Sequence, residues 1–452
     1  MIKKLLIANR GEIAVRIIRA ARELGISTVA VCSTADKLSL HAQIADETVC
    51  IGGPAARDSY LNQSALLAAC EITGADAVHP GFGFLSENAA FARLCRSCGV
   101  EFIGPAPEVI EALGDKSAAK STMKRLGIPV IPGSDGPVQS LEEAAKTARE
   151  IGYPVMVKAS AGGGGRGIRI VKAPEELEGA MTSASQEALA CFGDGRIYVE
   201  KFIENPHHVE IQVLGDKYGN VIHLGERDCS LQRRNQKMAE ESPSPIMTEE
   251  LRRAMGQAAV TAARAVGYQS AGTIEFLVDG GKNFYFMEMN TRIQVEHPVT
   301  ELVTALDLVA WQLRIGGGEP LSVRQEDVRI SGHAIECRIN AEDPDLDFRP
   351  SPGTITALHI PGGPGVRIDS GVYQGYTITP YYDSMIAKLI VWAPDRKTAL
   401  AKMNWALAEF LVEGVNTNIE FQLDLIRDPA VQAGDYDIGF IGRKLKARRE
   451  KR

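Results

Sequence analysis

The sequence predicts an α/β protein with a parallel sheet in its N-terminal part, and three observations lead to this fold class. Residues 1–114 alternate strand-like and helix-like runs, beginning with a strand at 5–8, a helix at 12–24 and a second strand at 26–32. This βαβ order favours a parallel sheet. The 452 residues, 45% of them hydrophobic, suffice for two to four domains with their own cores. From about residue 331 to 446 the sequence is richer in strands, which favours a mixed α+β section.

The elements after residue 114 surround a glycine-rich segment. Asp115 can cap a helix over 116–126, and Ser140 with Glu143 forms a capping box for a helix that ends near Gly152. Strands are expected at 155–158, 168–172 and 196–203, with a helix after Pro174.

Longer elements follow in the second half of the chain. Strands are expected at 208–214 and 221–225, and helices at 249–266 and 302–314. Residues 273–278 and 283–289 form a hairpin, because Asp279-Gly280-Gly281 is typical of a tight turn. An amphipathic helix at 396–412 closes the C-terminal section. Residues 443–452 hold seven basic residues against one acid, which predicts a frayed, solvated tail or a contact with an acidic partner.

The composition argues against several classes of protein. The net charge of -7 disfavours a nucleic-acid-binding protein. No run of about 18 apolar residues is present, and the apolar run at the N-terminus is too short for a signal peptide. The 8 cysteines are scattered, which is typical of reduced thiols, and the isolated pair Cys95 and Cys98 is more typical of helix thiols than of a metal site. We therefore expect a cytoplasmic protein without a nucleic-acid or membrane partner.

Residues 288–296 carry the most informative pattern in the chain. Polar side chains alternate there with apolar or small ones, at Glu288, Asn290, Arg292, Gln294 and Glu296. In an extended backbone these side chains share one face. Carboxylates and amides beside a guanidinium indicate a site for a charged, phosphorylated substrate. A solvated strand face is the alternative interpretation.

The glycine-rich segment, residues 158–167, is a candidate phosphate-binding loop. Its glycines allow free N–H groups to point at phosphate oxygens, and Lys158 and Lys116 can supply cations. It is not a Walker A motif, and the N-terminal part lacks the G-x-G-x-x-G of a dinucleotide-binding fold, which weakens a dehydrogenase interpretation. A flexible linker is the alternative.

The hairpin predicts a metal site. Glu275 and Glu288 lie on its two arms, near each other across the ladder, and Asn290 adds another oxygen. Oxygen ligands favour Mg²⁺ or Mn²⁺ over zinc, although two exposed acids remain the alternative. Arg292 suits a small oxyanion, and Glu296 can act as a base for a proton on that anion.

Five motifs together resemble one protein family. The chain resembles the biotin carboxylase subunits of biotin-dependent, acetyl-CoA-type carboxylases, which belong to the ATP-grasp superfamily. The resemblance covers residues 7 to about 446, and its motifs lie at 8–14, 79–88, 158–167, 226–234 and 288–298. It implies a Rossmann-like N-terminal domain at 1–114, an ATP-grasp domain at 115–330 with a lid at about 130–203, a C-terminal mixed α+β domain at 331–446, and a basic tail at 447–452. The apolar loop at 79–88 is expected to pack under the site.

The resemblance also implies roles for individual residues. Catalysis would depend on Arg292, Glu296, Arg338 and Lys237. Two Mg²⁺ or Mn²⁺ ions would bind Glu275, Glu288 and Asn290. Bicarbonate would bind Lys237, Arg292, Gln294 and the Val295 amide, and biotin would face Arg338. ATP would contact Lys116, Lys158, Gly164, Gly165, Glu200, Lys201, Ile203, His208, Gln232 and Asn235. Many relatives have histidine where this chain has Asn235, which can donate a hydrogen bond but carries no charge.

The resemblance further implies partners. The chain has no Ala-Met-Lys-Met biotin attachment site, so we expect no covalent biotin here, and biotin would arrive on a separate carboxyl carrier protein. Carboxyltransferase subunits and a homodimer are expected. Acetyl-CoA, propionyl-CoA or pyruvate could be the final acceptor. The alternatives are another ATP-grasp ligase with a different acceptor, or a regulatory ATP-binding protein that has lost catalysis.

Overall fold

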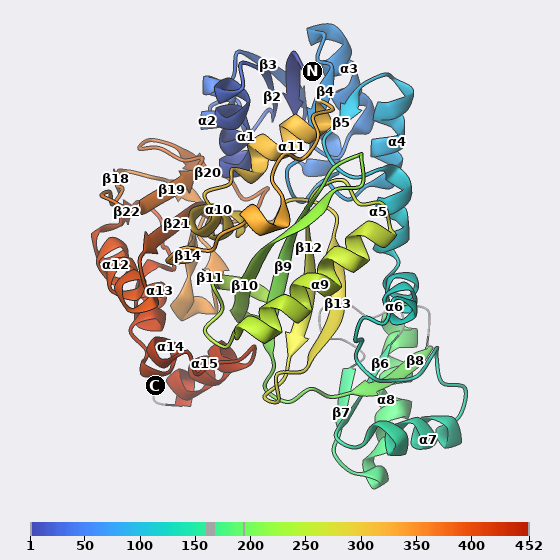
Figure 1. Ribbon diagram of the computed structural model, residues 1–452. Coiled ribbons are helices and arrows are strands. Elements are labelled where there is room, and N and C mark those ends of the chain that lie inside the picture. The colour runs from blue at the N-terminus through green and yellow to red at the C-terminus, as the bar shows by residue number, and fades with distance from the viewer. Residues whose placement is uncertain (1, 160–167, 193–194, 451–452) are drawn as a thin grey trace.

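The N-terminal part of the chain is a parallel sheet, as the sequence predicts. The computed structural model describes residues 2–159, 168–192 and 195–450. Five parallel strands lie in the order β3-β2-β1-β4-β5, at the top of Figure 1. The elements are β1 Lys4–Ile7, α1 Gly11–Glu23, β2 Ser27–Ser33, α2 Leu40–Ile44, β3 Glu47–Gly52, α3 Gln63–Thr73, β4 Ala77–His79, α4 Ala89–Ser97, β5 Glu101–Phe102 and α5 Pro107–Gly114.

A small unit with its own core projects from the body at the lower right of Figure 1. Its antiparallel strands lie in the order β7-β6-β8. The elements of this region are α6 Lys116–Arg125, α7 Leu141–Ile151, β6 Val155–Ala159, β7 Ile168–Val171, α8 Leu177–Phe192 and β8 Ile197–Lys201. Asp115 and Ser140 cap α6 and α7 as predicted, but the Glu143 carboxylate accepts from the N–H of Gln139 instead of that of Ser140. Gly164 and Gly165 lie outside the described residues.

An eight-stranded antiparallel sheet forms the centre of the molecule, in the order β13-β12-β9-β10-β11-β14-β21-β19. Its strands are β9 His207–Gly215, β10 Val221–Arg233, β11 Gln236–Ser242, β12 Ser270–Val278, β13 Phe284–Asn290, β14 His333–Asn340, β19 Val366–Ser370 and β21 Met385–Ala393. Helices α9 Glu249–Ala265, α10 His297–Thr304 and α11 Leu308–Gly316 pack against it. Because β11 pairs with β14, one sheet joins residues on both sides of position 330.

The C-terminal part packs helices against β14 and β21, at the left of Figure 1. The helices are α12 Arg396–Glu409, α13 Ile419–Ile426, α14 Pro429–Ala433 and α15 Phe440–Glu450. Short strands complete it: β15 Glu342–Asp343, β16 Arg349–Pro350, β17 Gly353–Thr354, β18 Ala357–His359, β20 Thr377–Ile378 and β22 Leu411–Glu413. No helix among the described residues combines the length and apolarity needed to cross a bilayer.

Four elements in the second half differ from the prediction, two of them only in where they end. The helix expected at 302–314 is two helices, because Ala305 adopts a left-handed backbone (φ 56) that ends α10, and Asp307 caps α11. The strand expected at 221–225 continues to Arg233, and β11 was not foreseen, because its buried residues are polar as well as apolar. The helix expected at 396–412 ends at Glu409, since Phe410 is extended and starts the path into β22.

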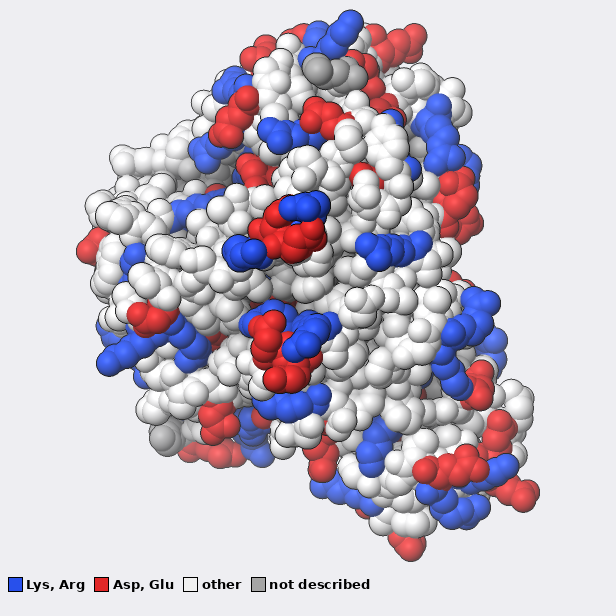
Figure 2. Space-filling view, viewed as in Figure 1, with Lys and Arg blue, Asp and Glu red and all other residues white. Residues whose placement is uncertain are grey.

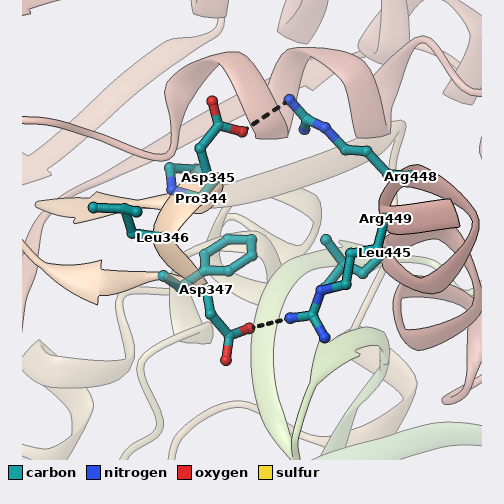
Figure 3. Close-up of a pocket in the computed structure, with 8 residues that line it drawn as sticks. Pro344, Asp345, Leu346, Asp347, Leu445, Arg448 and Arg449 are labelled. Atoms are coloured by element: carbon teal, nitrogen blue, oxygen red, sulfur yellow. Dashed lines mark hydrogen bonds and ion pairs between the residues drawn. The ribbon is translucent and has the colours of Figure 1, made fainter. Parts of the chain in front are cut away.

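The basic C-terminal segment is a helix rather than a frayed tail as far as Glu450. Arg448 forms an ion pair with Asp345 at 3.3 Å, and Arg449 forms one with Asp347 at 2.7 Å. Figure 3 shows both pairs, which hold α15 against the loop before β16 around a cavity of about 290 Å³. The basic side chains therefore find acidic partners within the same chain, which a count of charges along the sequence does not reveal.

On the face shown in Figure 2, acidic and basic side chains of the described residues lie intermixed, and many red and blue groups touch. Such an arrangement produces local ion pairs rather than a broad field of one sign.

Candidate active site

Glu275 and Glu288 lie opposite each other on β12 and β13, as the hairpin predicts. The register is bulged immediately after Glu275, between Glu275 and Phe276. The side-chain amide of Asn290 reaches back and donates to Glu275 Oε1 at 2.9 Å. All three oxygen-bearing side chains predicted for the metal site are therefore gathered at the end of one hairpin.

The polar segment after Asn290 is not a strand, and the prediction that one extended face carries all five polar residues was wrong. β13 ends at Asn290, residues 291–296 bend, and α10 begins at His297. Both sides of this bend are buried, with Ile293 at 0% and Gln294 at 3% exposure. His297 begins α10, and its Nδ1 lies 2.8 Å from the carbonyl oxygen of Gln294. Val295 also lies outside any strand, as expected for an amide that serves an anion.

Lys237 is the centre of the site. Its ammonium donates to Glu296 at 2.6 Å, Glu210 at 2.7 Å, Gln294 at 3.0 Å and Glu275 at 3.2 Å. Burial alone would lower the pKa of Lys237, but the surrounding acidic groups outweigh burial and raise it well above its ordinary value. This side chain therefore stays charged and holds three carboxylates from three different segments around one point.

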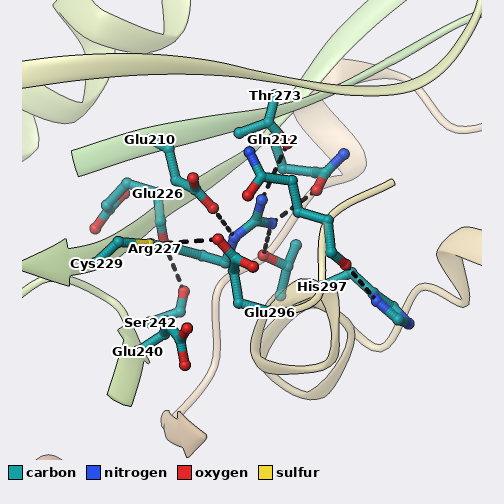
Figure 4. Close-up of polar contacts among 12 residues, drawn as sticks. Glu210, Gln212, Glu226, Arg227, Cys229, Glu240, Ser242, Thr273, Glu296 and His297 are labelled. Atoms are coloured by element: carbon teal, nitrogen blue, oxygen red, sulfur yellow. Dashed lines mark hydrogen bonds and ion pairs between the residues drawn. The ribbon is translucent and has the colours of Figure 1, made fainter. Parts of the chain in front are cut away.

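Glu210 and Arg227 belong to this cluster, although the sequence did not single them out. The Arg227 guanidinium is fully buried and donates to Glu210, to Gln212 at 2.7 Å and to Thr300 at 2.9 Å. Figure 4 shows Arg227 at the centre of these contacts, with Glu296 beside it. The signal was present in β9, where His208, Glu210 and Gln212 alternate with apolar residues in the same way as residues 288–296.

Glu296 lies between two cations. Its Oε1 accepts from Lys237, and its Oε2 accepts from the Arg338 guanidinium at 3.0 Å. Burial would raise the pKa of Glu296, but Lys237, Arg338 and Arg227 together hold it well below its ordinary value. Arg338 also donates to Glu240 at 2.7 Å. The predicted base is therefore an ionised carboxylate whose proton affinity is set by the neighbouring cations.

Arg292 and Lys116 reach the same region from its edge. The Nε of Arg292 donates to Glu87 at 3.0 Å, and its Nη2 donates to Asn290 at 2.9 Å. The contact with Glu87 comes from the loop at 79–88, which packs beside the site as predicted. The Lys116 ammonium lies 2.7 Å from Glu288, and its side chain is 79% exposed.

The donor set fits a divalent cation that prefers oxygen. Glu275, Glu288 and Asn290 supply carboxylate and amide oxygens, which suit Mg²⁺ or Mn²⁺. Lys237 and His208 hold the pKa of Glu275 well below its ordinary value despite its burial, so that this carboxylate is ionised. His208 Nε2 lies 3.0 Å from Glu275 Oε2, so it orients this carboxylate.

A cavity of about 1020 Å³ opens onto these residues. Most of the predicted site residues line it: Lys116, His208, Gln232, Asn235, Lys237, Glu275, Glu288, Asn290, Arg292, Gln294, Val295, Glu296 and Arg338. Its walls also include apolar residues that the sequence did not suggest, among them Leu277, Met287 and Ile438. The cavity thus has an apolar part and a densely charged part, as a nucleotide with its phosphates requires.

Four of the predicted ATP contacts do not line the cavity, namely Lys158, Glu200, Lys201 and Ile203. They lie in or directly after the three-stranded unit. Glu200 accepts from Lys158 and from Lys120, which lie 2.5 and 2.7 Å away, and Lys201 donates to the carbonyls of Gly152 and Tyr153. Glu200 is therefore engaged with Lys158 and with Lys120 of α6, and Lys201 with the carbonyls that precede β6.

Asn235 occupies a tight turn at the rim of the cavity. Arg234 and Asn235 join β10 to β11 and have φ values of 50 and 65. Two consecutive left-handed residues are typical of a type I′ hairpin turn, which asparagine adopts readily. The position is thus compatible with asparagine, and its contact with ATP stays a prediction.

Comparisons with known proteins cover almost the whole chain. Residues 1–110 match the family described as biotin carboxylase, N-terminal domain; 115–324 match carbamoyl-phosphate synthase L chain, ATP binding domain; and 336–443 match biotin carboxylase C-terminal domain. The chain is 58% identical to a biotin carboxylase of Nostoc sp., over 97% of this chain and 98% of that protein. It is 57% identical to biotin carboxylase 1 of Bacillus subtilis, over 98% of each.

A solved structure agrees with the sequence relatives. The biotin carboxylase domain dimer of the 2-oxoglutarate carboxylase of Hydrogenobacter thermophilus, in complex with MgADP, ADP and bicarbonate, superposes with a TM-score of 0.90 at 53% identity over 98% of each chain. The fold and the site define an ATP-dependent ligase with an ATP-grasp core. The chain belongs to the biotin carboxylase family, whose reaction is the ATP- and bicarbonate-dependent carboxylation of biotin.

Proposed function

We propose that this chain carboxylates biotin on a separate carrier protein through carboxyphosphate, and that the cluster around Lys237 performs the chemistry. The observation that carries the proposal is Glu296, a buried carboxylate held between Lys237 at 2.6 Å and Arg338 at 3.0 Å on the wall of the large cavity. The paired carboxylates Glu275 and Glu288 lie beside it. A base, two anion-binding cations and a metal-binding hairpin are thus within reach of one substrate.

ATP is proposed to occupy the cavity along its length. Leu277, Met287 and Ile438 supply an apolar slot for the base, while His208, Gln232 and Asn235 offer polar contacts. Glu275, Glu288 and Asn290 would hold Mg²⁺ or Mn²⁺, which would neutralise phosphate oxygens as charge develops during transfer. Lys116 would leave Glu288 for a phosphate oxygen, because its exposed ion pair is weak.

Bicarbonate is proposed to bind at Arg292, Gln294, the Val295 amide and Lys237. The anion would share Lys237 with Glu296 and so raise the pKa of that carboxylate from its low value. Glu296 then accepts the bicarbonate proton, and the anion attacks the γ-phosphate of ATP. Carboxyphosphate decomposes to CO₂ and phosphate, and phosphate takes the ureido proton of biotin. Arg338 stabilises the resulting anion, whose nitrogen attacks CO₂ to form carboxybiotin.

The small unit β7-β6-β8 is proposed to close over ATP. Lys158, Glu200, Lys201 and Ile203 do not line the cavity in this arrangement. Closure would bring them to the nucleotide, together with Gly164 and Gly165, and would exclude water from carboxyphosphate. The unit has a hydrophobic core of its own, which supports motion as one body.

We also propose the assembly that the resemblance implies. The relative from Hydrogenobacter thermophilus is a dimer, which supports a homodimer here. A biotin carboxyl carrier protein and carboxyltransferase subunits would complete the enzyme, with acetyl-CoA as the favoured acceptor. A pull-down with the tagged chain should recover a biotinylated carrier.

Biotin dependence tests the function directly. Purified protein with ATP, Mg²⁺ and bicarbonate should release ADP slowly, and free biotin should accelerate the release and yield carboxybiotin. The Glu296→Gln variant should not show the acceleration of ADP release by biotin. The substitution removes the proposed base and leaves the other residues of the site unchanged. ADP release that biotin does not change would contradict the assignment and favour another ATP-grasp ligase.

A further inference from the structure

Four ionisable side chains beside the active site share one face of the central sheet. Glu240 of β11 lies opposite Glu336 of β14, and Arg338 of β14 lies opposite Lys388 of β21. Glu336 and Arg338 are two residues apart on one strand, so they point to the same side. Helix α10 covers this face, because Val299 and Val303 pack against Ala334 and Ile390.

Glu240 and Glu336 are opposed carboxyl groups without a shared counterion. Their exposures are 1% and 0%. Glu240 Oε1 accepts from Arg338 at 2.7 Å, but Glu240 Oε2 and both oxygens of Glu336 have no hydrogen-bond partner among the described residues. Directly opposed residues on antiparallel strands bring their Cβ atoms to about 5 Å. Two negative charges that are so close and buried away from water repel each other strongly. A single proton shared by the two carboxyl groups removes this repulsion.

The other charges near this pair are already engaged. Lys388 donates to the carbonyl oxygen of Val295 at 2.9 Å and lies 3.1 Å from Glu12 and 3.7 Å from Asp369. On the segment that enters α10, Glu296 is paired with Lys237 and Arg338. Burial holds the pKa of His297, at the start of α10, well below its ordinary value, so this ring is neutral. Lys388, which faces Glu336, is therefore shared with Glu12, Asp369 and the Val295 carbonyl, and no described side chain donates a hydrogen bond to Glu336.

The titration behaviour of the pair agrees with this geometry. Burial raises the pKa of Glu240 to about 7, and Arg338 opposes that rise. Burial raises the pKa of Glu336 well above its ordinary value, with Lys388 opposing and Glu240 adding to the rise. Because Arg338 contacts Glu240 and not Glu336, the charge belongs on Glu240 and the proton on Glu336.

We propose that Glu336 is a protonated positioning residue that donates a hydrogen bond to Glu240, so that the pair carries one negative charge and holds Arg338 toward the cavity. This inference rests on the proposed function, in which Arg338 stabilises the biotin anion. With one negative charge on the Glu240–Glu336 pair, Arg338 is held in position, and its positive charge remains available to the biotin anion. A second negative charge, on Glu336, would offset the positive charge of Arg338 and would repel the biotin anion.

Infrared spectroscopy tests the shared proton without any activity measurement. The folded protein at neutral pH should show C=O stretches of buried carboxylic acids, to which Glu12 also contributes because burial raises its pKa, and Glu336→Gln should lower their total intensity by one carboxyl group. Glu241→Gln is the matched control. Glu241 is the next residue on β11 and equally buried, but it is ionised, since His333 at 2.6 Å and Arg396 at 2.8 Å hold its pKa at about 2. The control should keep the full intensity, and an unchanged intensity in Glu336→Gln would overturn the proposal.

The pH dependence of biotin use tests the positioning role. In the unsubstituted enzyme the KM for free biotin should rise with pH once the pair loses its proton, by up to about tenfold per pH unit. Glu336→Gln, which is permanently neutral and can still donate to Glu240, should keep the neutral-pH KM within about twofold and lose that rise. Glu336→Met should also lose the rise but have a higher KM at every pH, because it cannot donate.

The two measurements distinguish a failure of the proposed function from a failure of the shared proton or of the positioning role. A protein that shows this loss of intensity in Glu336→Gln but no biotin-dependent ADP release at any pH contradicts the proposed function and leaves the shared proton standing. A protein that uses biotin but has the same pH profile as Glu336→Gln contradicts the positioning role. Equal melting temperatures of the folded variants would confirm that loss of structure does not explain a difference in KM.

Discussion

Replacement of Lys237 by methionine tests the central cluster most directly. Lys237 contacts the carboxylates of Glu210, Glu275 and Glu296, and its side chain is only 12% exposed. Lys237→Met keeps most of the length of the side chain but leaves three buried carboxylates without their common cation. Removal of one partner from a buried ion pair costs about 3–5 kcal/mol. At about 1 °C per kcal/mol for a chain of this length, Tm should fall by about 3–5 °C at neutral pH.

The size of this loss should depend on pH in a predictable direction. In the unsubstituted protein the pKa values of Glu275 and Glu296 lie below their ordinary values. The stability that these lowered pKa values contribute is therefore fully present above the unfolded pKa near 4.5. It is lost as pH falls through the folded pKa. In Lys237→Met the stabilisation is missing, and the buried carboxyls gain from protonation as pH falls. The difference in Tm should thus be largest near neutral pH and shrink towards about pH 5.

Thermal unfolding across this pH range is the assay, with Lys402→Met as the control. Lys402 donates to the carbonyl oxygens of Pro364 and Trp392, at 2.7 and 2.8 Å, and forms no ion pair with a described carboxylate. Its replacement should lower Tm by a smaller amount that does not change between about pH 5 and pH 8. A Lys237→Met deficit that is equally independent of pH would refute the argument that Lys237 acts by neutralising buried carboxylates.

Two further substitutions separate the metal from the biotin site. Glu288→Lys should abolish turnover, because it places a cation where Mg²⁺ or Mn²⁺ is proposed to bind, opposite Glu275; near-normal ADP release would show that the metal binds elsewhere. Arg338→Ala should slow biotin carboxylation by about tenfold or more beyond its effect on biotin-independent ATP cleavage, since it removes one charge-assisted contact to the biotin anion. Both rates can be measured in the same ADP-release assay, and equal losses would argue against a specific role with biotin.

Local patterns in the sequence determined much of the secondary structure and the site. The βαβ order of the first hundred residues gave the parallel sheet, since strand and helix periods differ and are visible within short windows. The Asp279-Gly280-Gly281 turn placed Glu275 opposite Glu288, because a hairpin turn sets the register of its strands. Alternation also singled out residues 288–296, although the strand ends at Asn290.

Only the tertiary structure decided which of these segments meet. Lys237 is 27 residues from Glu210 and 59 from Glu296, yet it contacts both. The pairing of β11 with β14 brings Glu240 and Glu336 together. The packing of distant segments likewise brings Arg449 of α15 into contact with Asp347. Periodicity reports the conformation of a segment and the face that it buries. Strand pairing and the partners of buried charges are instead chosen by the packing of distant segments, which no local pattern encodes.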